Sequence, residues 1–205
     1  MTELTLLHTA EVHRATFDAL AERIAPGARL RHVVRPDWLA RAQDRIGADL
    51  ADEIAKTIAE APGAVLCSCT TLGPVAGAAG AVRIDAPMMA QAARAGGPVL
   101  LAYCLDSTRA ASRDLLAKAL EAAGRGTEIR LLDLTELWPL FERGEGTRFA
   151  RAIARRVETA LADAPETGCV VLAQASMAGA AAHVAANVPV LTSPEAALRA
   201  ALAMG

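Results

Sequence analysis

The sequence is poor in lysine and in aromatic residues, and each shortage narrows the chemistry open to the protein. Lysine occurs only as Lys56 and Lys118, so a cofactor that forms a Schiff base would have to use one of these two. The phosphate-binding pattern G-x-x-x-x-G-K-[ST] does not occur. Aromatic residues make up 3% of the chain, so alanine and the aliphatic residues must build the core. We therefore predict a protein that works without a cofactor or a bound metal ion.

Basic clusters and long apolar runs are also missing. The formal net charge is −2, from 21 basic and 23 acidic residues, which argues against a nucleic-acid partner. No apolar stretch approaches the ~20 residues of a membrane span, and Met1-Thr2-Glu3-Leu4 lacks the basic segment of a signal peptide. Four cysteines in 205 residues do not make a disulfide scaffold. We expect a cytoplasmic protein with free thiols and no membrane partner.

Short apolar runs alternate with stretches of helical spacing along the whole chain, in which 53% of the residues are hydrophobic. Strands that alternate with helices form right-handed βαβ units around a parallel sheet. The predicted strands are residues 4–9, 28–34, 64–69, 99–104, 128–132 and 169–173, and the predicted helices are residues 11–24, 38–59, 112–123 and 148–162.

The two halves of the chain resemble each other. The strand ending at Cys69 lines up with the strand ending at Gln174, an offset of 105, and residues 84–87 line up with residues 191–194, an offset of 107. We therefore predict an α/β fold of two pseudo-symmetric parallel-sheet lobes, built from a duplicated βαβ-type unit. The predicted first lobe is residues 1–97 plus 188–205, and the second is residues 98–187. A ligand-binding cleft is expected between them. The alternative is that any α/β chain shows this rhythm.

The run Cys67-Ser68-Cys69-Thr70-Thr71 follows a predicted buried strand and precedes a helix of small residues. A thiol at such a junction lies near free backbone N–H groups and the positive end of a helix, which lower its pKa below about 8.5. Cys69 would then serve as a base or nucleophile at neutral pH. Thr70 and Thr71 could donate hydrogen bonds to a carboxylate. The alternative is that Cys69, like Cys67, is a buried cysteine that acts as a small hydrophobe.

The order and spacing of these motifs resemble the aspartate, glutamate and hydantoin racemase superfamily, which includes maleate isomerases and arylmalonate decarboxylases. Cys69-Thr70-Thr71 resembles its first-lobe Cys-Asn-Thr or Cys-Ser-Thr motif, and His8-Thr9 falls where the family often has a polar pair. Asp106-Ser107-Thr108 with Ser112 resembles the loop that opens the second lobe, and residues 188–197 resemble the return to the first lobe. The resemblance implies two α/β lobes, no cofactor, one cysteine from each lobe beside the reacting carbon, and a homodimer.

The second lobe departs from the family pattern, which usually reads Leu-Gly-Cys. This chain has Leu172-Ala173-Gln174-Ala175-Ser176, so glutamine stands where the second cysteine would be. Glutamine donates and accepts hydrogen bonds but does not exchange a proton as a thiol does. Cys169 lies at the other end of its strand, some 16 Å away at ~3.3 Å per residue, and cannot substitute. Cys104, which ends its own strand, is better placed, with buried packing as its alternative role. One-base chemistry is therefore expected.

We hypothesise a cofactor-independent racemase- or isomerase-like enzyme acting on a small carboxylate-bearing substrate, with Cys69 as its base or nucleophile. Racemisation, isomerisation, decarboxylation and a lyase step all stay open. An alternative is a catalytically degenerate protein of the same fold that binds a small acid, and Gln174 itself could be a buried amide satisfied by backbone. The expected substrate-binding residues, with His8 also an acid–base candidate, are His8, Thr9, Thr70, Thr71, Thr108, Gln174, Ala175 and Ser176.

Overall fold

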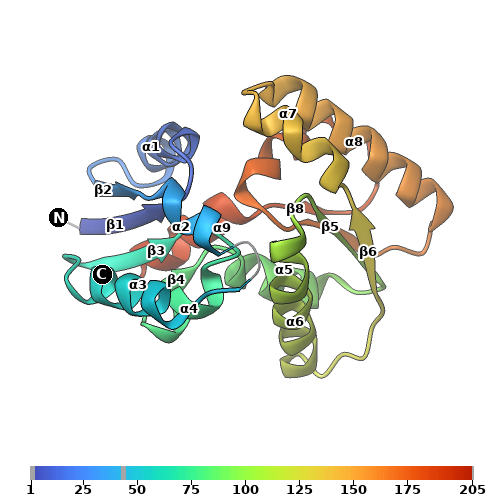
Figure 1. The fold of residues 1–205 in the computed structure, drawn as a ribbon. Coiled ribbons are helices and arrows are strands. Elements are labelled where there is room, and N and C mark those ends of the chain that lie inside the picture. Colours follow the sequence, from blue (N-terminus) through green and yellow to red (C-terminus); the bar gives the residue numbers. More distant parts are fainter. Residues whose placement is uncertain (1–2, 43–44, 205) are drawn as a thin grey trace. The chain divides into compact units, whose positions relative to one another are not determined.

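The computed structural model describes residues 3–42 and 45–204 and shows an α/β protein of two compact units (Figure 1). The first unit contains the described residues up to 87 and from 194 onward, and the second contains residues 88–193. Met1 and Thr2, which begin the stretch inspected for a signal peptide, lie outside the described residues.

A parallel sheet with the strand order β2-β1-β3-β4 forms the centre of the first unit. Because its strands are parallel, their carboxyl ends meet at one edge of the sheet. The elements of this unit are β1 (Glu3–His8), α1 (Val12–Ile24), β2 (Arg29–Val34), α2 (Pro36–Arg41), α3 (Ala48–Ala59), β3 (Ala64–Cys67), α4 (Gly73–Ala78), β4 (Val82–Arg83) and α9 (Ser193–Leu202).

The second unit repeats this arrangement with the strand order β6-β5-β7-β8, again all parallel. The predicted fold class of two similar parallel sheets is therefore confirmed. The elements of this unit are α5 (Ala86–Ala95), β5 (Val99–Tyr103), α6 (Asp106–Ala122), β6 (Ile129–Asp133), the 3-10 turn η1 (Thr135–Leu137), α7 (Trp138–Glu142), α8 (Gly146–Asp163), β7 (Cys169–Leu172), the 3-10 segment η2 (Ala175–His183) and β8 (Val190–Leu191).

The boundary between the units differs from the division expected from the sequence, which placed α5 and β8 in the first lobe. In the structure most of α5 and all of β8 belong to the second unit. Met88 and Met89 of α5 pack in the second core beside Leu101, and β8 pairs with β7. Helices α5 and α9 begin at Ala86 and Ser193, which are separated by the predicted offset of 107 residues.

The strands follow the apolar runs because helices cover both faces of a parallel sheet. Every residue of the central strands β5 and β7 is buried. The predicted helix over residues 38–59 is wrong as a single element, because α2 ends at Arg41 and α3 begins at Ala48. Gly47, with φ −73° and ψ 162°, holds an extended conformation just before α3. Glycine is a poor helix former, which favours a break at this point over one continuous helix.

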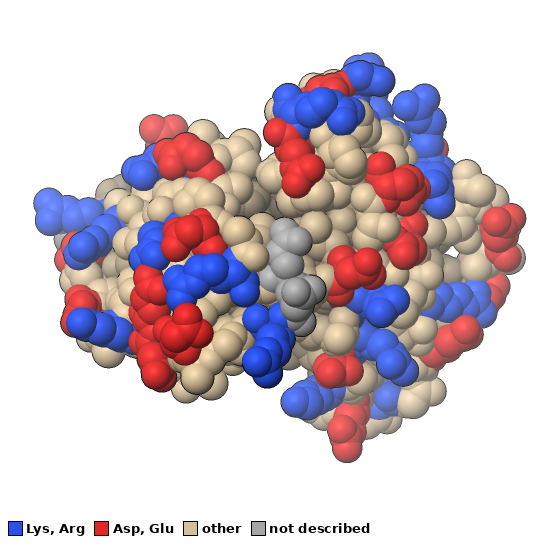
Figure 2. All heavy atoms as spheres, in the orientation of Figure 1, with Lys and Arg blue, Asp and Glu red and all other residues tan. Residues whose placement is uncertain are grey.

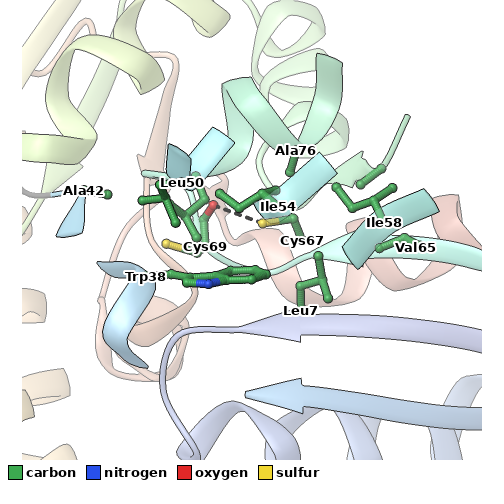
Figure 3. Packing of buried hydrophobic residues seen from close by; sticks show 12 residues of the cluster. Leu7, Trp38, Ala42, Leu50, Ile54, Ile58, Val65, Cys67, Cys69 and Ala76 are labelled. Atoms are coloured by element: carbon green, nitrogen blue, oxygen red, sulfur yellow. Dashed lines mark hydrogen bonds between the residues drawn. The ribbon is translucent and has the colours of Figure 1, made fainter. Parts of the chain in front are cut away.

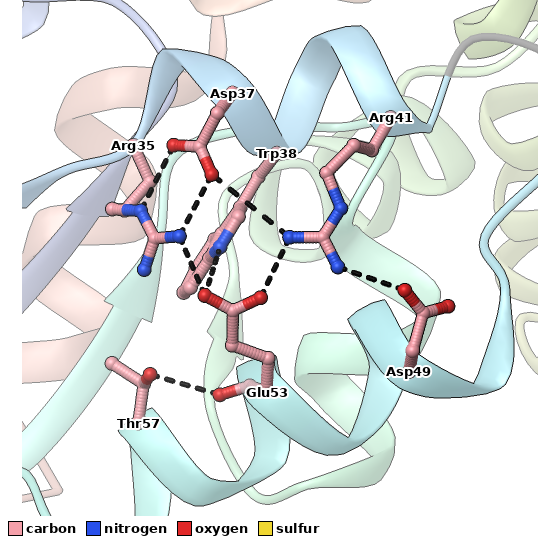
Figure 4. Close-up of polar contacts among 7 residues, drawn as sticks. All are labelled: Arg35, Asp37, Trp38, Arg41, Asp49, Glu53 and Thr57. Atoms are coloured by element: carbon pink, nitrogen blue, oxygen red, sulfur yellow. Dashed lines mark hydrogen bonds and ion pairs between the residues drawn. The ribbon is translucent and has the colours of Figure 1, made fainter.

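A network of charged side chains fastens α2 to α3 (Figure 4). Arg35 donates to both carboxylate oxygens of Asp37, at 2.9 and 2.7 Å, and its guanidinium carbon lies 4.7 Å from the centre of a Trp38 ring. Glu53 accepts hydrogen bonds from Arg35, Arg41 and the Trp38 indole N–H. The bonds from Arg41, Trp38 and Arg35 lower the pKa of Glu53 to about 2. The network thus holds the Trp38 ring, 1% exposed, in the core of the first unit.

The surface carries acidic and basic side chains of both signs, interspersed on the face shown in Figure 2. Many of them form ion pairs, such as Arg23 with Glu195 and Arg14 with Glu11. Over residues 3–42 and 45–204, no helix has both the length and the apolar character to cross a membrane.

Candidate functional site

Cys69 lies just beyond the carboxyl end of β3, at the edge where the strands of the first sheet end. Leu7 of β1 pairs with Cys67, and the Ser68 N–H donates to the Leu7 carbonyl at 2.9 Å. The predicted strand over residues 64–69 therefore ends early, at Cys67, because the chain turns after Ser68 to begin α4 at Gly73. Residues 68–72 form a loop at this edge.

The Cys69 sulfur combines an apolar surrounding with polar donors. The residue is 8% exposed and belongs to an apolar cluster that includes Trp38, whose ring lies near the sulfur in Figure 3. Burial raises the pKa of the thiol above its ordinary value. Hydrogen bonds from the Thr9 hydroxyl, the Leu72 and Thr71 N–H groups and the Thr71 hydroxyl act in the opposite direction. The expected lowering of the Cys69 pKa is therefore wrong, because desolvation outweighs the donors.

The other three thiols lie in different surroundings. All four cysteines are free and buried, and burial raises the pKa of each, that of Cys169 to about 11. Cys67 contacts the Cys69 carbonyl at 3.6 Å, and Cys169 contacts the Ala92 carbonyl at 4.0 Å. Both contacts place the sulfur against an acceptor. Cys69 differs because hydroxyl and amide donors meet its sulfur, and donors stabilise a thiolate.

Replacing Thr9 with valine is expected to slow the alkylation of Cys69 by iodoacetamide about tenfold, because the thiolate loses one hydrogen-bond donor. Because burial raises the pKa of Cys69 above the ordinary thiol value, the labelling of either protein should rise with pH from neutral into the alkaline range. The curve of labelling rate against pH should be shifted to higher pH in Thr9→Val. Labelling rates from peptide mass spectrometry measure both effects.

The matched control for this prediction is Thr16→Val, which removes an exposed hydroxyl that donates to the Val12 carbonyl of α1. Its labelling rate at Cys69 should equal that of the unmodified protein. Equal rates for Thr9→Val and the unmodified protein would show that the Thr9 hydroxyl does not stabilise the thiolate.

His8, expected to bind a ligand, ends β1 as a buried residue. Its Nδ1 lies 2.7 Å from the Ser68 Oγ, and its Nε2 lies 2.9 Å from Nδ1 of His32. Burial, together with His13 and His32, lowers the pKa of His8 to about 3, so its ring is neutral at pH 7. Ser68 and His32 are not among the residues expected from the sequence to bind a ligand. The strand register was the missing signal, because it places residues far apart in the chain beside His8.

Gln174 occupies the place in the second unit that Cys69 occupies in the first. Ala102 pairs with Leu172 as Leu7 pairs with Cys67, and both Cys69 and Gln174 come two residues later. The predicted offset of 105 residues is therefore confirmed. The Gln174 amide oxygen accepts a 2.6 Å hydrogen bond from the Cys104 N–H. This bond orients the amide so that its remaining polar group is an NH2, which only donates.

Four other predicted site residues lie at the corresponding edges of the two sheets. Thr70 is buried in the loop after β3. The loop expected at residues 106–112 is wrong, because α6 begins at Asp106. Thr108 is buried in the first turn of this helix, and its hydroxyl has no hydrogen-bond partner among the described residues. Ala175, buried, and Ser176, half-buried, begin η2. Within the part of the chain that the structure describes, no group of three or more His, Cys, Asp or Glu side chains is placed to hold a metal ion.

The fold of the chain matches that of several solved racemases. Glutamate racemase from Francisella tularensis, in complex with D-glutamate, has a TM-score of 0.69 at 11% identity over 97% of this chain and 79% of that one. Aspartate racemase from Picrophilus torridus has a TM-score of 0.69 at 15% identity, with coverages of 99% and 94%. Allantoin racemase from Pseudomonas fluorescens has a TM-score of 0.65 at 17% identity, with coverages of 98% and 90%.

The chain has the racemase fold. No protein-family model matches the sequence, and no curated protein matches it at a significant level. Its relation to the solved racemases is thus a likeness of fold, which covers both units. Within this racemase fold, the carboxyl edge of the first sheet carries a thiol at residue 69, and the equivalent place in the second unit carries an amide at residue 174.

Proposed function

We propose that this racemase-fold protein belongs to the aspartate, glutamate and hydantoin racemase superfamily. We further propose that it is an isomerase-type enzyme that moves a proton at a carbon beside a carboxylate. The observation that carries the proposal is the set of donors around the Cys69 sulfur, from Thr9, Thr71 and the Leu72 N–H. A buried thiol that serves only for packing needs no such donors, whereas a thiol that exchanges a proton needs them while it is ionised.

The raised pKa of Cys69 determines whether its side chain begins the reaction as an acid or as a base. At pH 7 the sulfur carries its proton, so Cys69 begins as an acid that can protonate a carbanion or an enolate. The surrounding donors then stabilise the thiolate that remains. This order of events suits decarboxylation or isomerisation with protonation on one face. Racemisation would also need Cys69 to remove a proton, which becomes easier as the pH rises.

The proposed substrate is a small acid whose carboxylate or enolate oxygens accept hydrogen bonds. Within the first unit, Thr70 is a candidate donor for such oxygens. Within the second unit, the candidates are the hydroxyl of Thr108, the amide NH2 of Gln174 and Ser176. The hydroxyl of Thr108 is buried and has no hydrogen-bond partner among the described residues. This supports a role in ligand binding, because such a hydroxyl gains a hydrogen bond when a ligand binds. Gln174 would bind the ligand without moving a proton, which leaves one thiol for the chemistry.

The test is a proton-exchange assay in D2O. The protein is incubated with a panel of small acids, comprising amino acids, their cyclic ureide derivatives, hydroxy acids and substituted malonates, and proton NMR follows the hydrogen at the reacting carbon. For at least one acid, we expect either that the NMR signal of this hydrogen disappears or that the acid releases CO2. A second candidate function, a binder of small acids without catalysis, is favoured by the amide at residue 174. Ligand-induced thermal stabilisation without any exchange, isomerisation or decarboxylation would support that binder.

A cytoplasmic location and a homodimer stay predictions. Size-exclusion chromatography with light scattering measures the second of these directly.

A further inference from the structure

Four side chains of the first unit form an unbroken chain of hydrogen bonds that the proposed chemistry of Cys69 does not use. Ser68 Oγ lies 2.7 Å from Nδ1 of His8, and Nε2 of His8 lies 2.9 Å from Nδ1 of His32. Nε2 of His32 lies 3.0 Å from a carboxylate oxygen of Asp18. The residues come from the loop after β3, from β1, from β2 and from α1.

The chain runs from the interior to the surface of the first unit. Ser68 is 3% exposed and His8 is 1% exposed, whereas the Asp18 side chain is 55% exposed. Asp18 also lines a hollow of about 520 Å³ next to Glu22 and Gly27, at the end of α1. The carboxylate that pairs with His32 is therefore in contact with solvent.

The carboxylate at one end fixes the direction of the first hydrogen bond, and in a chain of two neutral rings the other two directions follow from it. A carboxylate only accepts, so the Nε2 atom of His32 carries a hydrogen and donates it to Asp18. When the His32 ring carries only this one hydrogen, its Nδ1 accepts from the Nε2–H of His8. Neutral His8 in turn has an unprotonated Nδ1, and the Ser68 hydroxyl donates to it. The Ser68 hydroxyl thus donates to a base, His8, whose ring is oriented by His32 and Asp18. This is the arrangement of an activated nucleophile.

We infer that Ser68 is a nucleophile activated through a His8–His32–Asp18 proton relay, and that it takes the acyl group of a small ester. In the first step a bond forms between the Ser68 oxygen and the carbonyl carbon. The hydroxyl proton moves to Nδ1 of His8 and the Nε2 proton of His8 moves to Nδ1 of His32, whose ring becomes an imidazolium and keeps its Nε2–H on the Asp18 carboxylate. The bond to the leaving alcohol breaks, and the alcohol recovers a proton through the same chain. Water then releases the acid by the same steps.

The relay avoids a charge on the most buried ring. Burial is the main reason that the pKa of His8 is lowered to about 3, and His13 and Arg14 of α1 and His32 of β2 act in the same direction. His8 also faces Phe17 of α1, with ring centres 5.5 Å apart. Because His8 gives up one proton as it accepts another, the positive charge develops on His32, beside the carboxylate of Asp18.

This group is separate from Cys69. Leu7 and His8 of β1 point to opposite faces of the sheet, because side chains alternate along a strand, and Leu7 lies on the side of the Cys69 cluster. His8 packs against Phe17 of α1, whereas Cys67 and Cys69 belong to the cluster that contains Trp38 and the apolar side chains of α3. The inference therefore does not rest on the proposed function of Cys69, and the two can fail independently.

The first test reads the tautomers by nitrogen-15 NMR of the histidine rings in the intact protein at pH 7. We expect His8 and His32 both to be neutral and to carry their hydrogen on Nε2. A hydrogen on Nδ1 of His8 would reverse the Ser68 hydrogen bond and overturn the proposal. In Asp18→Asn, the His32 ring should lose its strong preference for the Nε2–H form.

The second test measures the rate at which Ser68 reacts with phenylmethanesulfonyl fluoride. In this reaction a bond forms between the serine oxygen and the sulfonyl sulfur, and fluoride leaves. We expect an adduct on the peptide that contains Ser68, and none there in Ser68→Ala. Asp18→Asn should lower the labelling rate about tenfold, because a charge-assisted hydrogen bond is lost. The control is Asp52→Asn, which changes an exposed carboxylate of α3 and should label at the original rate.

Absence of the Ser68 adduct, or equal labelling of Asp18→Asn and the unmodified protein, would show that the hydrogen-bonded chain is purely structural. The variant Asp18→Asn should fold, because more than half of the Asp18 side chain is exposed. Circular dichroism checks this before labelling.

Discussion

The variant Cys69→Ser is expected to lower the rate of substrate turnover by roughly 10²- to 10⁴-fold, the usual contribution of a positioned acid or base. Serine keeps the size and the hydrogen-bonding geometry of the side chain, but its hydroxyl gives up a proton far less readily than a thiol. The donors around residue 69, Thr9, Thr71 and the Leu72 N–H, would then surround a group that stays neutral. Exchange of the substrate proton in D2O measures the loss, and thermal unfolding checks that the variant is folded.

Cys169→Ala is the matched control for this prediction. Cys169 is also buried and free, but it lies at the amino end of β7, away from the edge where Gln174 follows the same strand. We expect this variant to keep its turnover per folded molecule, with some loss of stability from the smaller side chain. Activity that survives Cys69→Ser would remove Cys69 from the chemistry, whatever the racemase fold implies.

Replacing Arg83 with methionine is expected to destabilise the protein by ~3–5 kcal/mol, the usual cost of removing one partner of a buried ion pair. Arg83 donates from Nε and Nη2 to the two carboxylate oxygens of Asp85, at 2.9 and 2.8 Å. Asp85 is fully buried and the Arg83 side chain is only 17% exposed. Without the guanidinium, the Asp85 carboxylate would lie inside the protein with its charge uncompensated. Urea unfolding followed by circular dichroism measures the change.

The Arg83 side chain packs closely against helix α4. A Cβ at Gly73 would lie 3.0 Å from the Arg83 Nε, and one at Gly77 would lie 3.1 Å from its Cδ. The two glycines of α4 thus leave room for the arginine to lie along the helix. This contact also ties β4 to the helix that follows the Cys69 loop.

Two further variants make the Arg83 prediction decisive. Arg14→Met breaks the exposed pair with Glu11 and should cost ~0–1 kcal/mol, as surface pairs do. The double variant Arg83→Met/Asp85→Leu removes both buried charges and should recover most of the lost stability. A loss for Arg83→Met as small as that of Arg14→Met would contradict the view that Asp85 is held by its partner.

Local sequence patterns predicted the strands well and the boundaries of two helices badly. The helix predicted over residues 112–123 begins six residues earlier, at Asp106. The apolar runs before Cys69 and Gln174 became β3 and β7 because a strand buried on both faces needs an apolar residue at every position. The helix over residues 38–59 failed because its apolar spacing continues through a region where Gly47 takes an extended conformation. Periodicity records which side chains are buried, and it does not record where the backbone bends.

The candidate site was predictable in its positions and only partly in its chemistry. Matching the two halves of the sequence predicted that Gln174 takes the position in the second unit that Cys69 takes in the first. The strand registers agree with this prediction. The pKa of Cys69 was predicted in the wrong direction, because the N–H donors of the loop are local while the desolvation comes from residues such as Trp38 and Ile54 elsewhere in the chain.

By itself, the order of residues determined the alternation of strands and helices, the repetition of one plan in two halves, and the presence of glutamine at residue 174, the position that matches Cys69. These properties depend on neighbours in the chain and on spacing. Only the tertiary structure decided that the thiol of residue 69 rests in its protonated form and that Ser68, His8, His32 and Asp18 join in one hydrogen-bonded chain. Both depend on burial and on strand register, which bring together groups that lie up to 60 residues apart.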